Sequence, residues 1–177
     1  MNKALFLDRD GIINIDHGYV YQADQFEFVE GIFELCQHAQ AKGFQIIVIT
    51  NQSGIARGMY SEEQFLELTN WMKKEFLERQ VNITDVYFCP HHPTKGNEHY
   101  KITCDCRKPA PGMLIKAAKK HNINFSESFF VGDKVSDMQA AEAAGIENRI
   151  LVSGKYGDDQ AISALRLENV SSIIDHI

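Results

Sequence analysis

Short runs of apolar residues alternate along the chain with stretches in which apolar residues recur every three or four positions. Short apolar runs that end in a polar residue or a glycine are typical of buried strands, and the longer spacing is typical of amphipathic helices. The pattern predicts strands at residues 4–7, 44–50, 86–88, 128–131 and 150–152. It predicts helices at residues 31–42, 61–80, 111–121 and 135–144.

The residues at the ends of these segments support the helix predictions. Ser61 and Gln64 have the spacing of a capping box, and Pro111 suits the first turn of a helix. Gly43 and Gly145 suit helix C-termini. The last twenty residues are weakly patterned, and we expect a helix and a short edge strand there.

Strands that alternate with helices need crossover connections. The sequence therefore predicts an α/β protein with a Rossmann-like, mostly parallel sheet and helices on both faces. Residues 50–85 contain one clear helix, so no large cap domain is expected. We predict a single domain over residues 1–177.

Carboxylates stand where two predicted strands end. Asp8 and Asp10 follow the first strand, Thr50 ends the second, and Asp133 follows the fourth. Ligands bind at the carboxyl ends of parallel strands, so we expect these residues to converge there. Clustered acids need a compensating cation, and Mg²⁺ fits best. Asp8 is then the candidate nucleophile towards a phosphate, and Asp10 the candidate general acid/base.

Phosphate-binding groups follow the same strands, although each alone also suits an exposed turn or a solvated pair. Several such motifs in register favour a phosphate site over separate surface features. The candidates are Thr50, Asn51, Gln52 and Ser53 after the second strand, Arg107 and Lys108, and Lys134 beside Asp133.

Three of the four cysteines lie in one irregular stretch, residues 89–106, which we predict to be a zinc-binding loop. Three thiolates and one imidazole suit a structural zinc site in which protein fills all four positions. His91 and His92 are both in reach, and His91 is preferred because its spacing mirrors the cysteine pair. Cys36 is expected to be a core residue. The predicted ligands are Cys89, His91, Cys104 and Cys106.

Composition and charge narrow the class of partner. Of the 177 residues, 44% are apolar and 24% are charged, as in ordinary globular proteins. The net charge of −6 argues against a general nucleic-acid binder. We expect no targeting segment and no membrane span. We therefore expect a cytoplasmic monomer that acts on a small molecule, with Lys155, Asp158 and Asp159 on a solvated surface.

Four motifs resemble the ordered motifs of the haloacid dehalogenase superfamily: DRDG (8–11), ITNQSG (49–54), RKP (107–109) and GDKVSD (132–137). The resemblance implies a nucleophilic Asp8 and an acid/base Asp10, and Asp10 favours a phosphatase over a dehalogenase. It further implies magnesium held by Asp8, Asp133 and the backbone carbonyl of Asp10, phosphate ligands Thr50 and Lys108, and a supporting Asp137.

The chain also resembles one family in that superfamily, the D-glycero-β-D-manno-heptose 1,7-bisphosphate 7-phosphatases of lipopolysaccharide heptose synthesis. DHGY (16–19), TNQSGIARG (50–58), CPHHP (89–93) and CDCRKP (104–109) carry this resemblance. It implies release of the 7-phosphate and retention of the 1-phosphate. The implied substrate contacts are Asp16, His17, Gly18, Tyr19, Thr50, Asn51, Gln52, Ser53, Arg107, Lys108 and Lys134.

Three alternatives remain open at this point. A histidinol-phosphate phosphatase shares the fold and a similar cysteine loop. A phosphoacceptor signalling domain also gathers acids, Thr and Lys at strand ends, but its phosphorylated Asp lies on a middle strand, which here ends in Thr50. A zinc-bound scaffold without activity is disfavoured by Asp8, Asp10 and Asp133. The anomer that the enzyme prefers is left open.

Overall fold

Six parallel strands form one sheet in the computed structural model, which describes residues 1–153 and 162–177. Their order across the sheet is β3-β2-β1-β4-β5-β6. The surface expected at Lys155, Asp158 and Asp159 lies outside the described residues. The strands are β1 Lys3–Leu7, β2 Phe44–Asn51, β3 Ile83–Cys89, β4 Phe129–Gly132, β5 Asn148–Val152 and β6 Leu165–Leu167.

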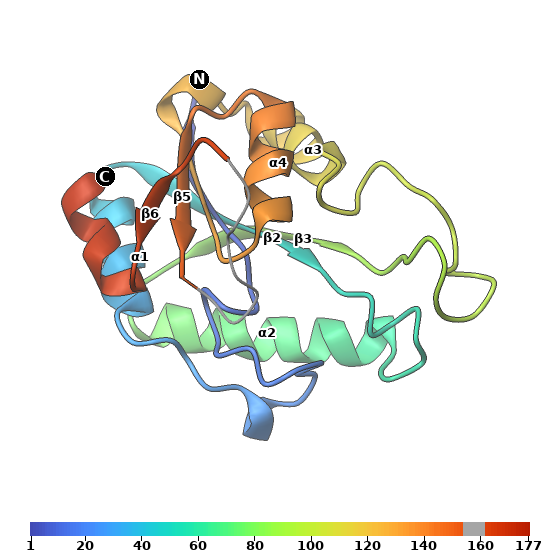
Figure 1. The fold of residues 1–177 in the computed structure, drawn as a ribbon. Helices are drawn as coiled ribbons and strands as arrows, with labels where there is room; N and C mark the ends of the chain where they lie inside the picture. The colour runs from blue at the N-terminus through green and yellow to red at the C-terminus, as the bar shows by residue number, and fades with distance from the viewer. Residues whose placement is uncertain (154–161) are drawn as a thin grey trace.

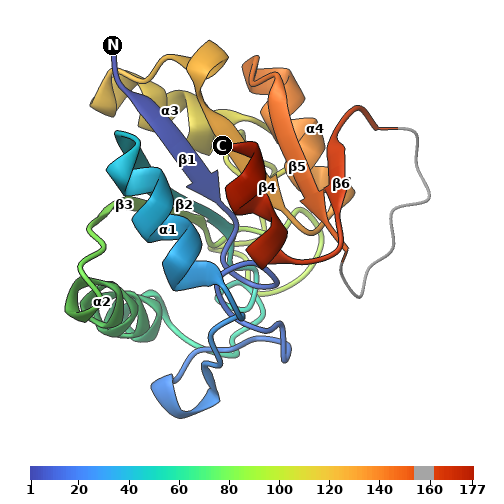
Figure 2. The same ribbon diagram turned by 90° about the vertical axis from the view of Figure 1, so that its left-hand side faces the viewer.

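Helices cover both faces of the sheet (Figures 1 and 2). The helices α1 and α2 and the C-terminal 3₁₀ helix η3 pack on one face, and α3 and α4 pack on the other. Side chains of β1 alternate between these layers: Leu5 and Leu7 belong to the first core, and Ala4 and Phe6 to the second. The predicted α/β architecture is therefore confirmed. The helices are α1 Ile32–Ala41, α2 Glu62–Glu78, α3 Gly112–His121, α4 Val135–Ala144, η1 Ala23–Gln25, η2 Phe125–Glu127 and η3 Val170–His176.

Local signals set the ends of the helices as predicted. The Ser61 hydroxyl accepts a hydrogen bond from the backbone N–H of Gln64 at 3.1 Å, and the Gln64 side chain accepts one from the Ser61 N–H at 2.9 Å. Pro111 is the N-cap of α3, one position earlier than the first helical residue. Gly145 ends α4 in the left-handed conformation, with φ of 93°.

Strand β3 is longer than its apolar run, since it begins at Ile83 and the pattern predicted residues 86–88. The polar Asp85 interrupts the run. Because β3 is an edge strand, Asp85 can pair with α3, where Lys120 Nζ lies 2.8 Å and His121 Nε2 lies 2.7 Å from its carboxylate. Between β2 and β3 the chain forms one helix, α2, so no large cap is inserted there.

The strand order reverses between β1 and β4, which are hydrogen-bonded neighbours. In parallel sheets the crevice at such a reversal, outside the carboxyl ends of the strands, is the usual ligand site. Asp8 directly follows β1 and Asp133 directly follows β4. None of the described helices is long and apolar enough to span a membrane.

Candidate active site

Three buried carboxylates meet at the carboxyl ends of β1 and β4. Ligand oxygens of Asp8, Asp133 and Asp137 all lie within 4.8 Å of one another. Asp137, from the first turn of α4, accepts hydrogen bonds on Oδ2 from the backbone N–H groups of Asp133 (3.2 Å) and Lys134 (3.1 Å). Gly11 must be glycine here, because its φ is +97° and a Cβ would lie 2.1 Å from Asp133 Oδ2.

The ammonium of Lys108 lies between two of these carboxylates. Its Nζ is 2.9 Å from Asp8 Oδ1 and 2.7 Å from Asp137 Oδ1, and it donates to the Ile49 carbonyl at 2.8 Å. Burial alone would lower the pKa of Lys108, but the charges of Asp137 and Asp8 raise it above its ordinary value. Lys108 is therefore a permanent cation at the centre of the site.

One cation does not balance the acids. Burial raises the pKa of Asp133 to about 8, and the charges of Asp8 and Asp137 add to the effect. Burial and the charge of Asp137 also raise the pKa of Asp8 to about 6, against the opposing charges of Lys108 and Lys134. Asp133 Oδ1 is buried with no hydrogen-bond partner among the described residues. The excess negative charge and this open acceptor fit a hard divalent cation.

Asp10 lies at the same edge in different surroundings. Its Oδ1 accepts hydrogen bonds from Arg9 Nη2 and Asn14 Nδ2, both at 3.0 Å, and its Oδ2 accepts one from Gln52 Nε2 at 3.1 Å. Burial alone would raise the pKa of Asp10, but the Arg9 charge and these hydrogen bonds lower it below its ordinary value. The pKa values of Asp8 and Asp10 are thus shifted in opposite directions, so that the surroundings of Asp8 favour its neutral form and those of Asp10 favour its charged form.

Gln52 connects Asp10 to Thr50, the residue predicted to bind phosphate. The same Nε2 that bonds Asp10 donates to Thr50 Oγ1 at 2.8 Å. The hydroxyl of Tyr60 donates to Gln52 Oε1, and the Tyr60 ring stacks on Tyr21 with centroids 5.5 Å apart. Gln52 therefore orients two site residues in addition to lining the cleft.

Asn51 fixes the segment that carries Arg107 and Lys108. Its Nδ2 donates to the Lys108 carbonyl at 3.1 Å, and its Oδ1 accepts from the Lys108 N–H at 3.0 Å. This reciprocal pair ties the last residue of β2 to the backbone of Lys108. The structure thus gives Asn51 a positioning role besides its place in the cleft wall.

A cleft of about 620 Å³ opens at this edge of the sheet. Besides the predicted residues, its wall contains Arg57, Tyr60 and Ser136, which the sequence analysis did not single out. The predicted site residues in its wall are Asp10, Asp16, Gly18, Tyr19, Asn51, Gln52, Ser53, Arg107, Lys108 and Lys134.

The loop at residues 16–19 contributes only part of its predicted contacts. Asp16, Gly18 and Tyr19 line the cleft, and Asp16 Oδ1 accepts a hydrogen bond from the Gly18 N–H at 3.0 Å. The His17 side chain instead pairs with Glu27 at 2.9 Å and lines a different hollow. The structure therefore does not bring His17 to the cleft.

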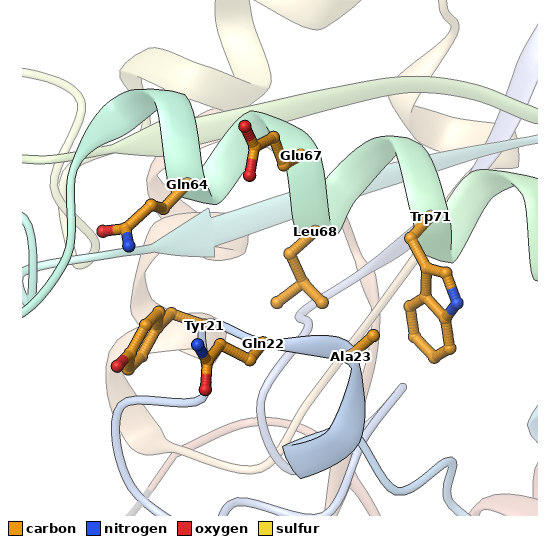
Figure 3. A pocket seen from close by; sticks show the side chains of 7 residues that line it. All are labelled: Tyr21, Gln22, Ala23, Gln64, Glu67, Leu68 and Trp71. Atoms are coloured by element: carbon orange, nitrogen blue, oxygen red, sulfur yellow. The ribbon is translucent and has the colours of Figure 1, made fainter.

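A smaller cavity of about 260 Å³ lies between η1 and α2, where Leu68 and Trp71 project towards Gln22 and Ala23 (Figure 3). Its one charged lining residue is the acidic Glu67, which would repel a phosphate. The predicted phosphate-binding cations Arg107, Lys108 and Lys134 line the 620 Å³ cleft, and we assign the candidate active site there.

The four predicted zinc ligands also come together. Ligand atoms of Cys89, His91, Cys104 and Cys106 lie within 4.8 Å of one another. His91 Nδ1 is 3.6 Å from Cys89 Sγ and 3.4 Å from Cys106 Sγ, and the sulfur–sulfur distances are 2.8, 3.3 and 3.6 Å. Zinc–sulfur bonds of about 2.3 Å in a tetrahedral site would place two sulfurs about 3.8 Å apart. The 3.6 Å sulfur–sulfur distance fits this geometry, and Cys106 Sγ lies closer to the other two sulfurs than bound zinc would place it. His92 Nδ1 instead accepts hydrogen bonds from the backbone N–H groups of Thr94 and Lys95.

Comparison with known proteins identifies the family. A model of HAD-hydrolase-like proteins matches residues 105–175. The D-glycero-β-D-manno-heptose-1,7-bisphosphate 7-phosphatase of Yersinia pestis is 51% identical over 149 residues, which cover 84% of this chain and 79% of that protein. The enzyme of the same name from Pasteurella multocida is 54% identical over 152 residues, which cover 86% and 82%. The chain belongs to this 7-phosphatase family.

The fold of this 7-phosphatase family member also matches a solved structure. The D,D-heptose 1,7-bisphosphate phosphatase from B. bronchiseptica, crystallised with magnesium and phosphate, has a TM-score of 0.86 and 26% identity. The match covers 98% of this chain and 97% of that one.

In this family member, three side chains beyond the predicted set shape the site. Arg9 is 2% exposed and donates a hydrogen bond to Asp10. Its position in the sequence between two aspartates could have indicated this role. Arg57 belongs to the quoted TNQSGIARG motif but was not assigned a role. Tyr60 had no local signal, because its contact with Gln52 depends on the turn between β2 and α2.

Proposed function

We propose that this protein removes the 7-phosphate of D-glycero-D-manno-heptose 1,7-bisphosphate and leaves heptose 1-phosphate, as a step in ADP-heptose and lipopolysaccharide core synthesis. The observation that carries the proposal is the identity of 51% to the Y. pestis 7-phosphatase over 84% of the chain. The cleft that gathers Lys108, Arg107 and Lys134 around Asp10 supports an anionic substrate.

In the proposed reaction, Asp8 attacks the phosphorus of the 7-phosphate. The bond between phosphorus and the C7 oxygen breaks, and Asp10 gives its proton to the departing oxygen. A dianionic phosphate beside Asp10 raises the pKa of that carboxyl, which favours the protonated form once substrate is bound. Asp10 then takes a proton from the water that hydrolyses the aspartyl-phosphate, and Asp8 is restored.

The residues at the strand ends fit a magnesium ion, and we propose Asp8, Asp133 and the backbone carbonyl of Asp10 as its ligands. Bound Mg²⁺ would neutralise charge on the phosphoryl group and the carboxylates. Asp137 is better suited to a supporting role, because Lys108 and two backbone N–H groups already occupy its oxygens. Lys108 and Thr50 are proposed to stabilise the transferred phosphoryl group.

Zinc is proposed at the cluster Cys89, His91, Cys104 and Cys106, as a structural ion. Four protein ligands leave no open position for chemistry. Cys106 directly precedes Arg107 and Lys108, so a metal-fixed loop would hold these cations in place.

We also propose that the chain acts as a monomer and a single domain in the cytoplasm. The proposed zinc site requires three of the four cysteines to be reduced, which suits a reducing compartment. The proposed substrate contacts are the predicted set, with His17 the least supported because its ring pairs with Glu27. Gel filtration with light scattering tests the monomer.

The proposed function is tested by measuring phosphate release with and without Mg²⁺. The substrates are both anomers of heptose 1,7-bisphosphate and, for comparison, histidinol phosphate. We expect magnesium-dependent release from the bisphosphate, with one equivalent lost from C7 and the C1 phosphorus resonance retained. Faster hydrolysis of histidinol phosphate would support the competing assignment, which the family membership does not favour. Loss of the C1 phosphate would contradict the proposed position of attack.

A further inference from the structure

Arg57 is an exposed cation in the wall of the active-site cleft. Its guanidinium carbon lies 5.9 Å from the ring centroid of Tyr19, another residue of the cleft wall. None of the ion pairs between described residues involves Arg57. The positive charge of Arg57 therefore faces the cleft without a carboxylate partner among the residues that the structure describes.

The cations of the cleft fall into two groups. Lys108 bonds Asp8 and Asp137, and the pKa of Lys134, which burial alone would lower, is raised by Asp8 and the other acids. Both lysines therefore act on the carboxylates of the reacting end. Arg57 and Arg107 make no ion pair with those carboxylates, and among the described residues the Arg107 side chain donates only to the His91 carbonyl, from Nη1 at 3.4 Å.

Arg57 and Arg107 line the same cleft although 50 positions separate them in the chain. Arginine presents a planar set of N–H donors that matches a phosphate in a bidentate way. A bisphosphate whose first phosphate lies at Asp8 would offer its second phosphate to such a pair.

The loop that carries the cysteine cluster supports the segment around Arg57. The Asn97 N–H donates to the Ala56 carbonyl at 3.0 Å, and the Arg57 N–H donates to the Ser53 carbonyl at 3.0 Å. Gly96 has φ of +96°, and a Cβ there would lie 2.0 Å from the Ala56 carbonyl oxygen. The backbone under Arg57 is thus held on both sides.

We propose that Arg57, together with Arg107, binds the phosphate that is not transferred, and that Tyr19 holds the Arg57 side chain against the cleft. The inference rests on the proposed function. It makes Arg57 a specificity-determining residue that favours bisphosphates over monophosphates.

The test compares two substrates that differ only in the second phosphate, heptose 1,7-bisphosphate and heptose 7-phosphate. In Arg57→Gln we expect kcat/KM for the bisphosphate to fall by about ten- to a hundredfold, mainly through KM, with a much smaller fall for the monophosphate. Arg57→Lys should recover part of the loss. The inhibition constant of the product, heptose 1-phosphate, should rise in Arg57→Gln.

Arg79→Gln is the matched control, since Arg79 is an exposed arginine over an aromatic ring, 4.3 Å from the Phe33 centroid, at the far end of α2. It should keep the wild-type preference between the two substrates. If wild type releases no phosphate from the bisphosphate, the proposed function fails. If wild type does so but Arg57→Gln loses equal factors on both substrates, or none, only the role of Arg57 is refuted.

Discussion

The buried acids at the ends of β1 and β4 predict that, without magnesium, the folded protein loses stability as the pH rises. The perturbation that isolates this effect is Asp133→Asn, which keeps the shape of the side chain and removes its charge. Burial, with the charges of Asp8 and Asp137, raises the pKa of Asp133 to about 8 from an ordinary value of 3.8.

The sign follows from proton binding. Between about pH 4 and pH 8 the folded protein keeps a proton on Asp133 that the unfolded chain has released, so the free energy of unfolding falls as the pH rises. A difference of one bound proton changes the free energy of unfolding by about 1.4 kcal/mol per pH unit. From pH 5 to pH 7 the free energy of unfolding therefore falls by about 3 kcal/mol. For a chain of this length the loss lowers Tm by roughly 6–12 °C.

The dependence of Tm on pH is measured by thermal unfolding of wild type and Asp133→Asn. Circular dichroism follows the unfolding from pH 5 to pH 8 in magnesium-free buffer. Metal analysis must confirm that both samples have equal zinc content. Burial and the charges of Arg107 and Arg57 lower the pKa of His92, which gives an opposite slope, but both proteins share it. Saturating Mg²⁺ should raise the Tm of wild type more at pH 7 than at pH 5, because a cation favours the ionised carboxylates.

Equal pH slopes in the two proteins would refute the raised pKa of Asp133. A wild-type Tm that rises from pH 5 to pH 7 without magnesium would refute the excess of buried negative charge. Equal stabilisation of wild type and Asp133→Asn by Mg²⁺ would contradict the fit of the cation to this carboxylate.

Three further substitutions test the rest of the site. Asp8→Asn should reduce phosphate release by about a thousandfold or more while the Tm stays within a few degrees, and turnover near the wild-type rate would overturn the nucleophile assignment. Asn51→Ala should lower kcat/KM by about tenfold, since it removes two hydrogen bonds to the Lys108 backbone, and unchanged kinetics would argue against this positioning role. Cys104→Ala should abolish zinc binding in metal analysis and lower activity, whereas Cys36→Ala should keep its zinc; zinc-free wild type would contradict the metal assignment.

The fold was predictable because most of its elements carry local signals. The capping box of Ser61 and Gln64 and the stop at Gly145 act within a few residues, and strands buried on both faces read as apolar runs. The extent of β3 was not predictable in this way. Asp85 breaks its apolar run, and the partners that make the residue acceptable there, Lys120 and His121, belong to a helix more than 30 positions away.

In the candidate site too, contacts that follow from local patterns were predictable and contacts between distant segments were not. Asp8 and Asp133 could be brought together from the sequence because both follow apolar strands and parallel strands end at one edge. The bond between Asn51 and Lys108 spans 57 positions and needs the final register of a loop against a strand end. Arg57 approaches the cleft only through the packing of two irregular loops, at Asn97 and Ala56, for which no periodic pattern exists.

The distribution of charge explains why those long-range contacts matter. A buried carboxylate is costly unless a cation or hydrogen-bond donors compensate it. Asp10 receives its donors from Arg9 and Asn14 in its own loop and from Gln52 after β2. Asp8 depends instead on Lys108, which is 100 positions away. Asp133 has no comparable partner for its Oδ1. Asp133 is therefore the carboxylate at which we expect the proposed magnesium ion to contribute most to stability and catalysis.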